Sequence, residues 1–316
     1  MSSFLDSLAF SLSVTGPIFV VLVLGIWFRR IELIGDVFIR DGSRLVFNVA
    51  LPMLLFLSVA KTDIRDAASG SLLVYTVVAI TLVYIALEWA ATRWIKPAKD
   101  RGVVVQGAFR SNLGIVGLAY CANTYGEAGI VAASIPIAIL TIHFNILGVI
   151  TLRRSLHGGQ GVVPMLRGVV TNPLIIGIVL GLPVVPLGIE LPQVAAQSAQ
   201  YFANLTLPLA LLCTGASLDF AALKGELRNT VAASVGRLVV VPAVITMGAA
   251  LLGYRGMDLG VLMLLISSPA AAASYIMVRA MGGNAALAAN IIAVTTFGSV
   301  VATSISITLM RGLGLM

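Results

Sequence analysis

The sequence predicts an all-α polytopic membrane protein with ten transmembrane helices, arranged as two inverted five-helix repeats in which helices 4 and 9 are broken and cross. The composition, the spacing of apolar runs and an internal repeat support this prediction. Of the 316 residues, 59% are hydrophobic and 10% are charged, and the mean hydropathy is +1.03. A soluble protein carries about 25% charged residues because its surface must be hydrated. The composition therefore excludes a soluble globular protein, a disordered chain and a small disulfide scaffold.

Charged residues and Gly- or Pro-rich breaks separate apolar runs of about 20 residues, the length at which a helix crosses roughly 30 Å of hydrocarbon. The first five helices are expected at 9–28 before Arg29, 38–60 before Lys61, 71–92 before Arg93, 102–123, and 128–151 before Arg153. The second five are expected at 167–187, 198–217, 229–252 after Arg228, 258–279 ending at Arg279, and 285–310 before Arg311. The halves are thus 1–151 and 167–316, joined by a cytosolic link at 152–166.

Lysine and arginine are distributed unevenly between alternate loops, and cytosolic loops are normally enriched in them. The rich loops hold Arg29, Arg30, Arg40, Arg44, Arg93, Lys96, Lys99, Arg101, Arg153, Arg154, Arg167, Lys224, Arg228 and Arg279. The opposite loops hold Lys61, Arg65, Arg255 and Arg311. We therefore expect the rich loops in the cytosol and both termini outside it.

The sequence aligns with itself at the offset that separates Asn48 from Asn204, 156 residues. Each half holds five spans, an odd number, so the second copy must enter the membrane from the opposite side. Inverted repeats of this kind are typical of secondary transporters, whose halves move around a central site. The matching residues are Asn48, Leu51, Pro52, Leu55, Ala60 and Asp63 with Asn204, Leu207, Pro208, Leu211, Ala216 and Asp219.

Residues that interrupt helices lie at corresponding places in the fourth and ninth spans. Gly114 and Gly117 lie near the middle of one and Pro269 near the middle of the other. Proline removes a backbone donor, and glycine costs about 1 kcal/mol in a helix. Unwinding here leaves two half-helix N-termini with unpaired N–H groups, which favour an anion, whereas the carbonyl ends suit a proton carrier or Na⁺. Two ordinary kinked helices are the alternative. The candidate binding residues at the breaks are Ser111, Asn112, Gly114, Ser267, Ser268 and Pro269.

A second pair of bends is expected where Pro52 and Pro208 each follow an asparagine by four residues. Asn48 and Asn204 are candidates to line the same cavity. The alternative is that each amide only caps backbone groups that its own proline leaves free.

Four ionisable residues lie within spans, where an ionised group costs several kcal/mol unless it is paired or hydrated. They are Glu88, Arg110, His143 and Arg237, in spans three, four, five and eight. One interpretation is a positive cytosolic vestibule that attracts an anion, with His143 assisting proton coupling. The alternatives are structural ion pairs, such as Glu88 with Arg237 or Arg110, and a neutral histidine bonded to a carbonyl.

Several classes of function lack support in the sequence. There is no GxxxxGK[ST] phosphate loop, and two histidines with two dispersed cysteines do not suggest a metal cluster. No arrangement of serine, histidine and acid suggests a nucleophile. We therefore expect no enzyme, no cofactor, no metal site and no nucleic-acid partner.

The segments NVALPMLLF (48–56), GAFRSNLGIVGL (107–118), NPLIIGIVLGL (172–182), LALLCTGASL (209–218) and SSPAAAASYIMVRAMGG (267–283) together resemble the auxin efflux carrier family. Their order spans both halves, and the short link is similar to that of the bacterial members. The resemblance implies a scaffold of helices 1, 2, 6 and 7 and a moving transport unit of helices 3–5 and 8–10. It also implies a bacterial inner membrane location and a homodimer.

The resemblance implies an organic anion as substrate, such as malonate, malate or an auxin-like acid, bound beside Asn112 and Pro269. Asn48, Asn145, Ser268 and Tyr275 are its implied neighbours. Many relatives have a proline in the fourth-span break, where this chain reads Gly117-Leu118-Ala119. The expected function is secondary transport by an elevator-like motion, driven by a proton gradient or the membrane potential. The alternatives are a Na⁺-coupled symporter similar to the bile acid family and a channel or membrane sensor.

Overall fold

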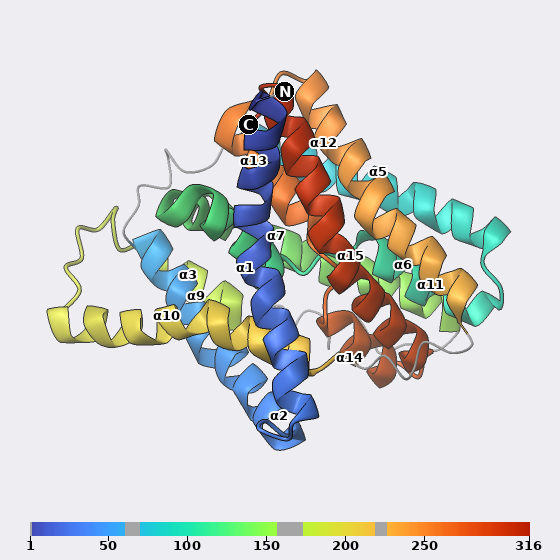
Figure 1. The fold of residues 1–316 in the computed structure, drawn as a ribbon, viewed down its shortest axis with the longest axis horizontal. Helices are drawn as coiled ribbons and strands as arrows, with labels where there is room; N and C mark the ends of the chain where they lie inside the picture. The colour runs from blue at the N-terminus through green and yellow to red at the C-terminus, as the bar shows by residue number, and fades with distance from the viewer. Residues whose placement is uncertain (1, 61–69, 157–172, 219–225) are drawn as a thin grey trace.

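In the computed structural model the described residues, 2–60, 70–156, 173–218 and 226–316, form α-helices and no β-strand (Figure 1). The all-helical class is therefore confirmed. The first half contains α1 (Ser2–Arg30), α2 (Asp36–Leu45), η1 (Val46–Ala50), α3 (Leu51–Ala60), α5 (Gly70–Trp94), η2 (Ala98–Asp100), α6 (Arg101–Phe109), η3 (Leu113–Gly117) and α7 (Leu118–Leu156). The second half contains α9 (Pro173–Gly181), α10 (Gln193–Ala216), α11 (Leu227–Val235), η5 (Gly236–Val240), α12 (Val241–Leu251), α13 (Gly256–Ser267), α14 (Ala273–Ala280) and α15 (Ala285–Gly312).

Six helices among the described residues are long and apolar enough to cross a membrane, as expected of a multi-pass membrane protein. Of the other expected spans, the fourth and ninth are divided by breaks, and the sixth begins outside the described residues. Gln200 and Asn204 lower the hydropathy of α10. The ten-span count therefore stays a prediction. The six are Ala9–Arg30, Asp36–Ala60, Gly70–Trp94, Leu113–Leu156, Leu227–Leu251 and Ala285–Gly312.

The longest helix, α7, contains the second half of the expected fourth span and the whole of the fifth. Gly126 divides it, with φ of 62° and ψ of −141°. This left-handed conformation favours glycine because it has no Cβ. The turn therefore lies between 123 and 128, where the sequence predicts a boundary.

Helices that belong to the first two spans of each half pack closely on one another. A Cβ at Gly25 of α1 would clash with the Leu212 carbonyl of α10, and one at Gly215 of α10 would clash with Leu22 of α1. A Cβ at Gly177 of α9 would likewise meet the backbone of Pro52 in α3. Small residues let helix backbones approach in this way within membranes. The four helices are those expected to form the scaffold, and their role as an immobile unit stays a prediction.

The remaining helices, α5–α7 and α11–α15, pack around the two breaks, and α15 also lies along α1. Figure 1 shows the two termini together at one end of the molecule. Hydroxyl contacts join α1 to α15 below them: Thr15 lies 2.8 Å from Ser304, and Thr308 donates to Ser11 over 3.2 Å. The breaks therefore lie in the interior of this second group of helices.

Candidate functional site

The two broken helices cross at their breaks, where both backbones are extended. Backbone hydrogen bonds join the two segments there. Ser111 and Ala270 form an antiparallel bridge. The Asn112 N–H donates to the Pro269 carbonyl over 2.8 Å, and the Ala271 N–H donates to the Arg110 carbonyl over 3.1 Å. The crossing is thus a four-ended junction: α6 and α13 end at it, and η3 and α14 begin at it.

The sequence explains the two breaks differently. Pro269 disfavours helical geometry in the residue before it, and Ser268 has an extended ψ of 154°. No proline acts in the first half, where α6 ends before Arg110. Gly117 instead lets η3 approach α13 closely, because a Cβ at Gly117 would lie 3.1 Å from the Leu265 side chain. The first break consequently lies at residues 110–112, before the glycines that led us to expect it.

The carbonyl ends of the two incoming helices are occupied by side chains. Arg237 of η5 donates from Nη1 to the Phe109 carbonyl of α6 over 2.6 Å and from Nη2 to the Ile266 carbonyl of α13. On α13, the Ser268 hydroxyl donates to the Leu265 carbonyl over 2.8 Å, and the Thr303 hydroxyl donates to Ser267 over 3.3 Å. Arg237 is fully buried. The last carbonyl of α6 and three carbonyls in the last turn of α13 therefore each have a side-chain donor.

The amide ends of the two outgoing helices are open by comparison. Within the described chain, the N–H groups of residues 113–116 have no partner, because the first bond of η3 runs from Gly117 to the Asn112 carbonyl over 2.9 Å. The N–H groups of Ala272 and Ala273 at the start of α14 are also free among the described residues, and both residues are exposed. Free N–H groups at helix N-termini attract negative charge.

Arg110 extends from the first break toward α7 and α14. Its Nη2 donates to Asn145 Oδ1 over 2.7 Å, and its Nη1 lies 3.5 Å from the Met277 sulfur. Gln106 donates to the same sulfur over 3.0 Å. Arg110 is buried, and no carboxylate of the described residues lies within ion-pair distance of it. A buried cation without a carboxylate beside open amide ends is suited to an anionic ligand.

The other predicted binding residues are distributed unevenly. Asn112 is buried at the crossing, and the hydroxyls of Ser111 and Ser267 are buried there without a partner among the described residues. Gly114 and Tyr275 are half-buried on η3 and α14. Asn48 and Asn204 are exposed and bond one turn back along their own helices, Asn48 to the Arg44 carbonyl over 2.9 Å and Asn204 with Gln200 over 2.9 Å. The described contacts therefore do not connect these two asparagines to the crossing, and their role stays a prediction.

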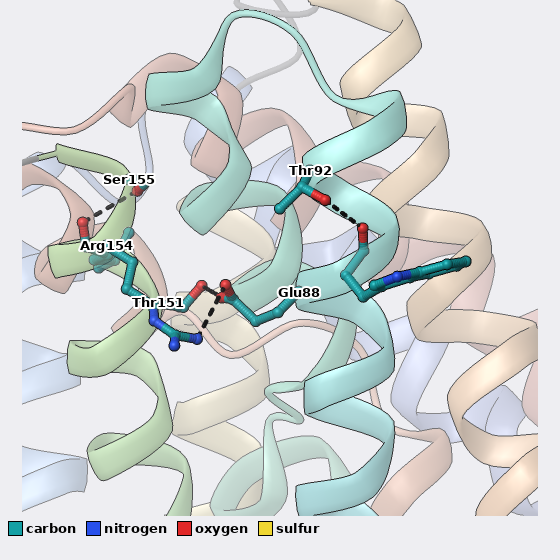
Figure 2. A network of polar contacts seen from close by, with 7 residues as sticks. Glu88, Thr92, Thr151, Arg154 and Ser155 are labelled. Carbon is teal, nitrogen blue, oxygen red and sulfur yellow. Dashed lines mark hydrogen bonds and ion pairs between the residues drawn. The ribbon is translucent and has the colours of Figure 1, made fainter.

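Glu88 pairs with α7, and Figure 2 shows the cluster it forms. Thr151 donates to its Oε1, and Arg154 Nη1 lies 3.8 Å from its Oε2. The pairing with Arg237 or Arg110 that the sequence suggested is therefore not made. Thr151 and Arg154 are three residues apart, so one face of α7 presents both to α5. The cluster joins α5 to α7, and its described contacts do not include residues of the crossing.

His143 contacts Thr81 of α5, with 3.1 Å between its Nε2 and the hydroxyl oxygen. The Thr81 proton is already donated to the Val77 carbonyl over 2.8 Å. The single Thr81 proton cannot be donated to both partners, so the direction of the contact with His143 depends on the histidine tautomer. The partner is a hydroxyl, where the alternative from the sequence was a carbonyl.

A pocket lies between α5, α7 and α13 and extends along α13 as far as Leu265. Its walls are mostly apolar, with Thr76 and Asp258 as polar exceptions, and they include Leu265, which packs on Gly117. The pocket therefore approaches the broken helices from the side of Asp258, the first turn of α13.

The sequence did not indicate a polar cluster at the start of three helices. The Asn284 side-chain nitrogen donates to Asp100 over 3.2 Å and to Glu226 over 3.0 Å, while its side-chain Oδ1 accepts from the Leu287 N–H as the cap of α15. Burial raises the pKa of Asp100 above its usual value, with Glu226 adding to the rise and Asn284 and Lys99 opposing it. Asparagine after two glycines and before an apolar run is an N-cap signal that indicates the cap but not its partners.

A family model described as membrane transport protein matches residues 13–160 and 162–307 of the chain. A protein of Methanothermobacter thermautotrophicus described as an uncharacterized transporter is 28% identical over 260 residues, which cover 80% of this chain and 83% of that protein. A second uncharacterized transporter, from Methanocaldococcus jannaschii, is 24% identical over 261 residues, or 80% and 84% of the two chains. The family model's match includes both halves and every residue of the crossing.

Proposed function

This chain belongs to the membrane transport protein family, as its resemblance to the auxin efflux carriers indicated, and we propose that it is a secondary transporter of small organic anions. The substrate class is a carboxylate of the size of malonate, malate or an auxin-like acid. Transport follows alternating access with an elevator-like motion, in which helices 3–5 and 8–10 move against a scaffold of helices 1, 2, 6 and 7. In this motion the crossing is the binding site that moves with the transport unit.

The observation that carries the proposal is the asymmetry of charge at the crossing. Each open amide end carries about half a positive charge. Arg110 adds a full charge, and its described contacts are the Asn145 amide and the Met277 sulfur. A carboxylate supplies the missing negative charge and accepts several hydrogen bonds at once. A cationic substrate would meet only positive potential here.

The polar side chains around this point are suited to orient a carboxylate. Asn112 is buried and does not cap η3, so its amide is available. Ser111 and Ser267 bring hydroxyls without a described partner. We assign the substrate to Asn112, Ser111 and Asn145, with Gly114, Ser268, Pro269 and Tyr275 around them and Asn48 and Asn204 lining the approach.

A proton gradient or the membrane potential drives the cycle in this proposal, and Glu88 and His143 are the candidate coupling groups. Both lie on the interface of α5 with α7, within the proposed moving unit. The protein is placed in a bacterial inner membrane with both termini outside the cytosol, as the distribution of basic residues indicates. Two copies pair through their scaffold helices.

Counterflow in proteoliposomes tests the function. Purified protein is first screened for thermal stabilisation by a panel of mono- and dicarboxylates, because a ligand that binds the folded state raises the temperature at which the protein unfolds. Hits are then measured for saturable exchange. We expect Asn112→Ala to abolish most of this exchange, whereas Asn123→Ala, further along the same chain segment and bonded to the Val14 carbonyl, preserves it. Unchanged transport of every substrate in Asn112→Ala would show that the crossing is not the site.

A further inference from the structure

Arg237 is the one described side chain that bonds to both broken helices at once. Its two terminal nitrogens reach the Phe109 carbonyl of α6 and the Ile266 carbonyl of α13. Both carbonyls belong to the last turn of a helix, where backbone acceptors lack an intrahelical partner. The planar guanidinium, with its fixed fork of donors, is suited to join two such acceptors.

The charges at this point balance without any other ion. Each helix carboxyl end carries about half a negative charge, so two ends together carry about one. Arg237 supplies one positive charge, is fully buried, and has no carboxylate within ion-pair distance among the described residues. Its counter-charge is therefore the pair of helix ends.

The local sequence explains how Arg237 reaches this position. Pro242 lacks an N–H group and cannot donate one turn back along the helix. The helix widens into the π-turn η5 immediately before it, and Arg237 is the second residue of that turn. Gly236 beside it lies against the Ala108 side chain of α6, where a Cβ would come within 2.9 Å. The widened turn and the glycine together bring the guanidinium to the helix ends.

We propose that Arg237 is a built-in cation at the crossing, in the position that a bound metal cation would need in order to neutralise the two carbonyl ends. Carbonyl ends of broken helices are suited to Na⁺, which the sequence left open as a coupling ion. Here the guanidinium, together with the hydroxyls of Ser268 and Thr303, already uses these acceptors. Substrate binding and transport therefore do not require Na⁺.

The same contacts make Arg237 a positioning residue for the moving unit. It connects the eighth span to the fourth and the ninth, so these three move together. This consequence for transport depends on the proposed function, whereas the charge balance does not. The two claims therefore need separate measurements.

The test compares the purified wild type with Arg237→Gln and Arg237→Lys in NaCl, LiCl and choline chloride at equal ionic strength. The wild type is expected to unfold at one temperature in all three salts. Arg237→Gln is expected to unfold at a lower temperature in choline chloride and to recover part of the loss in Na⁺ or Li⁺, because the uncovered carbonyls then accept the metal ion. Arg237→Lys keeps the charge and is expected to unfold at an intermediate temperature without salt selectivity. Arg110→Gln, in which the carbonyl ends stay covered, is the matched control and shows no selective recovery.

Selective stabilisation of the wild type by Na⁺ would overturn the proposal, as would Arg237→Gln that gains nothing from Na⁺ or Li⁺. If Arg237→Gln does not fold in any salt, the wild type and Arg237→Lys still decide, because selectivity for Na⁺ in either contradicts a built-in cation. Counterflow in the same salts is the second readout. A wild type that transports nothing would count against the proposed function, while the unfolding comparison would still decide the role of Arg237.

Discussion

The carbonyl ends and the amide ends of the two broken helices meet at one crossing, but the rest of the chain treats them differently. At the carbonyl ends, Arg237 and Thr303 supply hydrogen-bond donors from other helices, and Ser268 supplies one from the end of α13 itself. At the amide ends, residues 113–116 keep free N–H groups among the described residues, and no side chain caps η3 or α14. Side chains therefore donate to the carbonyl ends of both helices, whereas the amide ends of η3 and α14 are left open among the described residues.

This difference indicates the sign of the ligand more directly than net charge does. A broken helix offers both a negative and a positive end, so breaks alone suit a cation or an anion equally. In the proposed function, Arg237 neutralises the negative ends from within, which leaves the amide ends and Arg110 to attract the ligand. The two buried arginines therefore differ in their described contacts: Arg237 bonds to two helix ends, and Arg110 bonds to the Asn145 side chain.

The largest expected effect is on stability, from Arg237→Met. Each buried carbonyl left without a donor costs about 1–3 kcal/mol, so loss of both lowers the free energy of unfolding by about 2–6 kcal/mol. Thermal and SDS-induced unfolding of the purified protein measure this. Arg228→Met is the control, since Arg228 is exposed on α11, in the same expected span, and its described hydrogen bond is to the Trp94 carbonyl at 3.4 Å. Equal stability of the two variants would show that Arg237 does not stabilise the carbonyl ends.

Arg110→Gln is expected to act on ligand binding instead. A hydrogen bond to a charged group contributes about 1.5–3 kcal/mol, which corresponds to roughly 10- to 150-fold in affinity. The apparent affinity for the carboxylate in counterflow should fall by this factor, while unfolding changes less than in Arg237→Met. Arg279→Gln, at an exposed arginine on α14, is the control. A variant with normal affinity but low stability would assign Arg110 to the structural class with Arg237.

The sequence predicted the free amide ends of the broken helices better than the side-chain donors at their carbonyl ends. Pro269 is visible as a helix breaker, and the amide end of α14 follows from it by helix geometry, whereas Gly114 and Gly117 indicated a break in the fourth span but not its position at 110–112. Ser268 bonds within its own helix end, but the other donors at the carbonyl ends come from distant parts of the chain: the partner of Thr303 is 36 residues away, and those of Arg237 are 128 and 29 residues away. A buried arginine suggests a carboxylate partner, so Glu88 was the expected partner from the sequence. In the structure Glu88 contacts Thr151 and Arg154 of α7 instead.

A substitution of Thr303 tests whether the stability of the carbonyl ends depends on Arg237 alone. Thr303→Val keeps the shape of the side chain and removes its hydrogen bond to the Ser267 carbonyl, at a cost of about 1 kcal/mol. Thr296→Val is the control on the same helix, because Thr296 donates to Ile292 within its own helix over 2.7 Å. A loss confined to Thr303→Val would show that the helix end needs donors besides the arginine. Equal losses would leave Arg237 as the only important donor.

The smallest effect is expected far from the crossing, where Asp100, Glu226 and Asn284 join the starts of α6, α11 and α15. Burial raises the pKa of Asp100, so the folded state takes up its proton at a higher pH than the unfolded state, whose pKa is about 3.8. Stability contributed by this group therefore rises as pH falls through the raised pKa and is complete below the unfolded value. Asp100→Asn should be as stable as the wild type or slightly more stable at pH 7, with the advantage disappearing on acidification. Unfolding midpoints between pH 4 and 8 measure the difference, with Glu190→Gln as an exposed control. A variant that is less stable at pH 7 would mean that the ionised carboxylate is needed, and that this cluster ties the three helices together by charge.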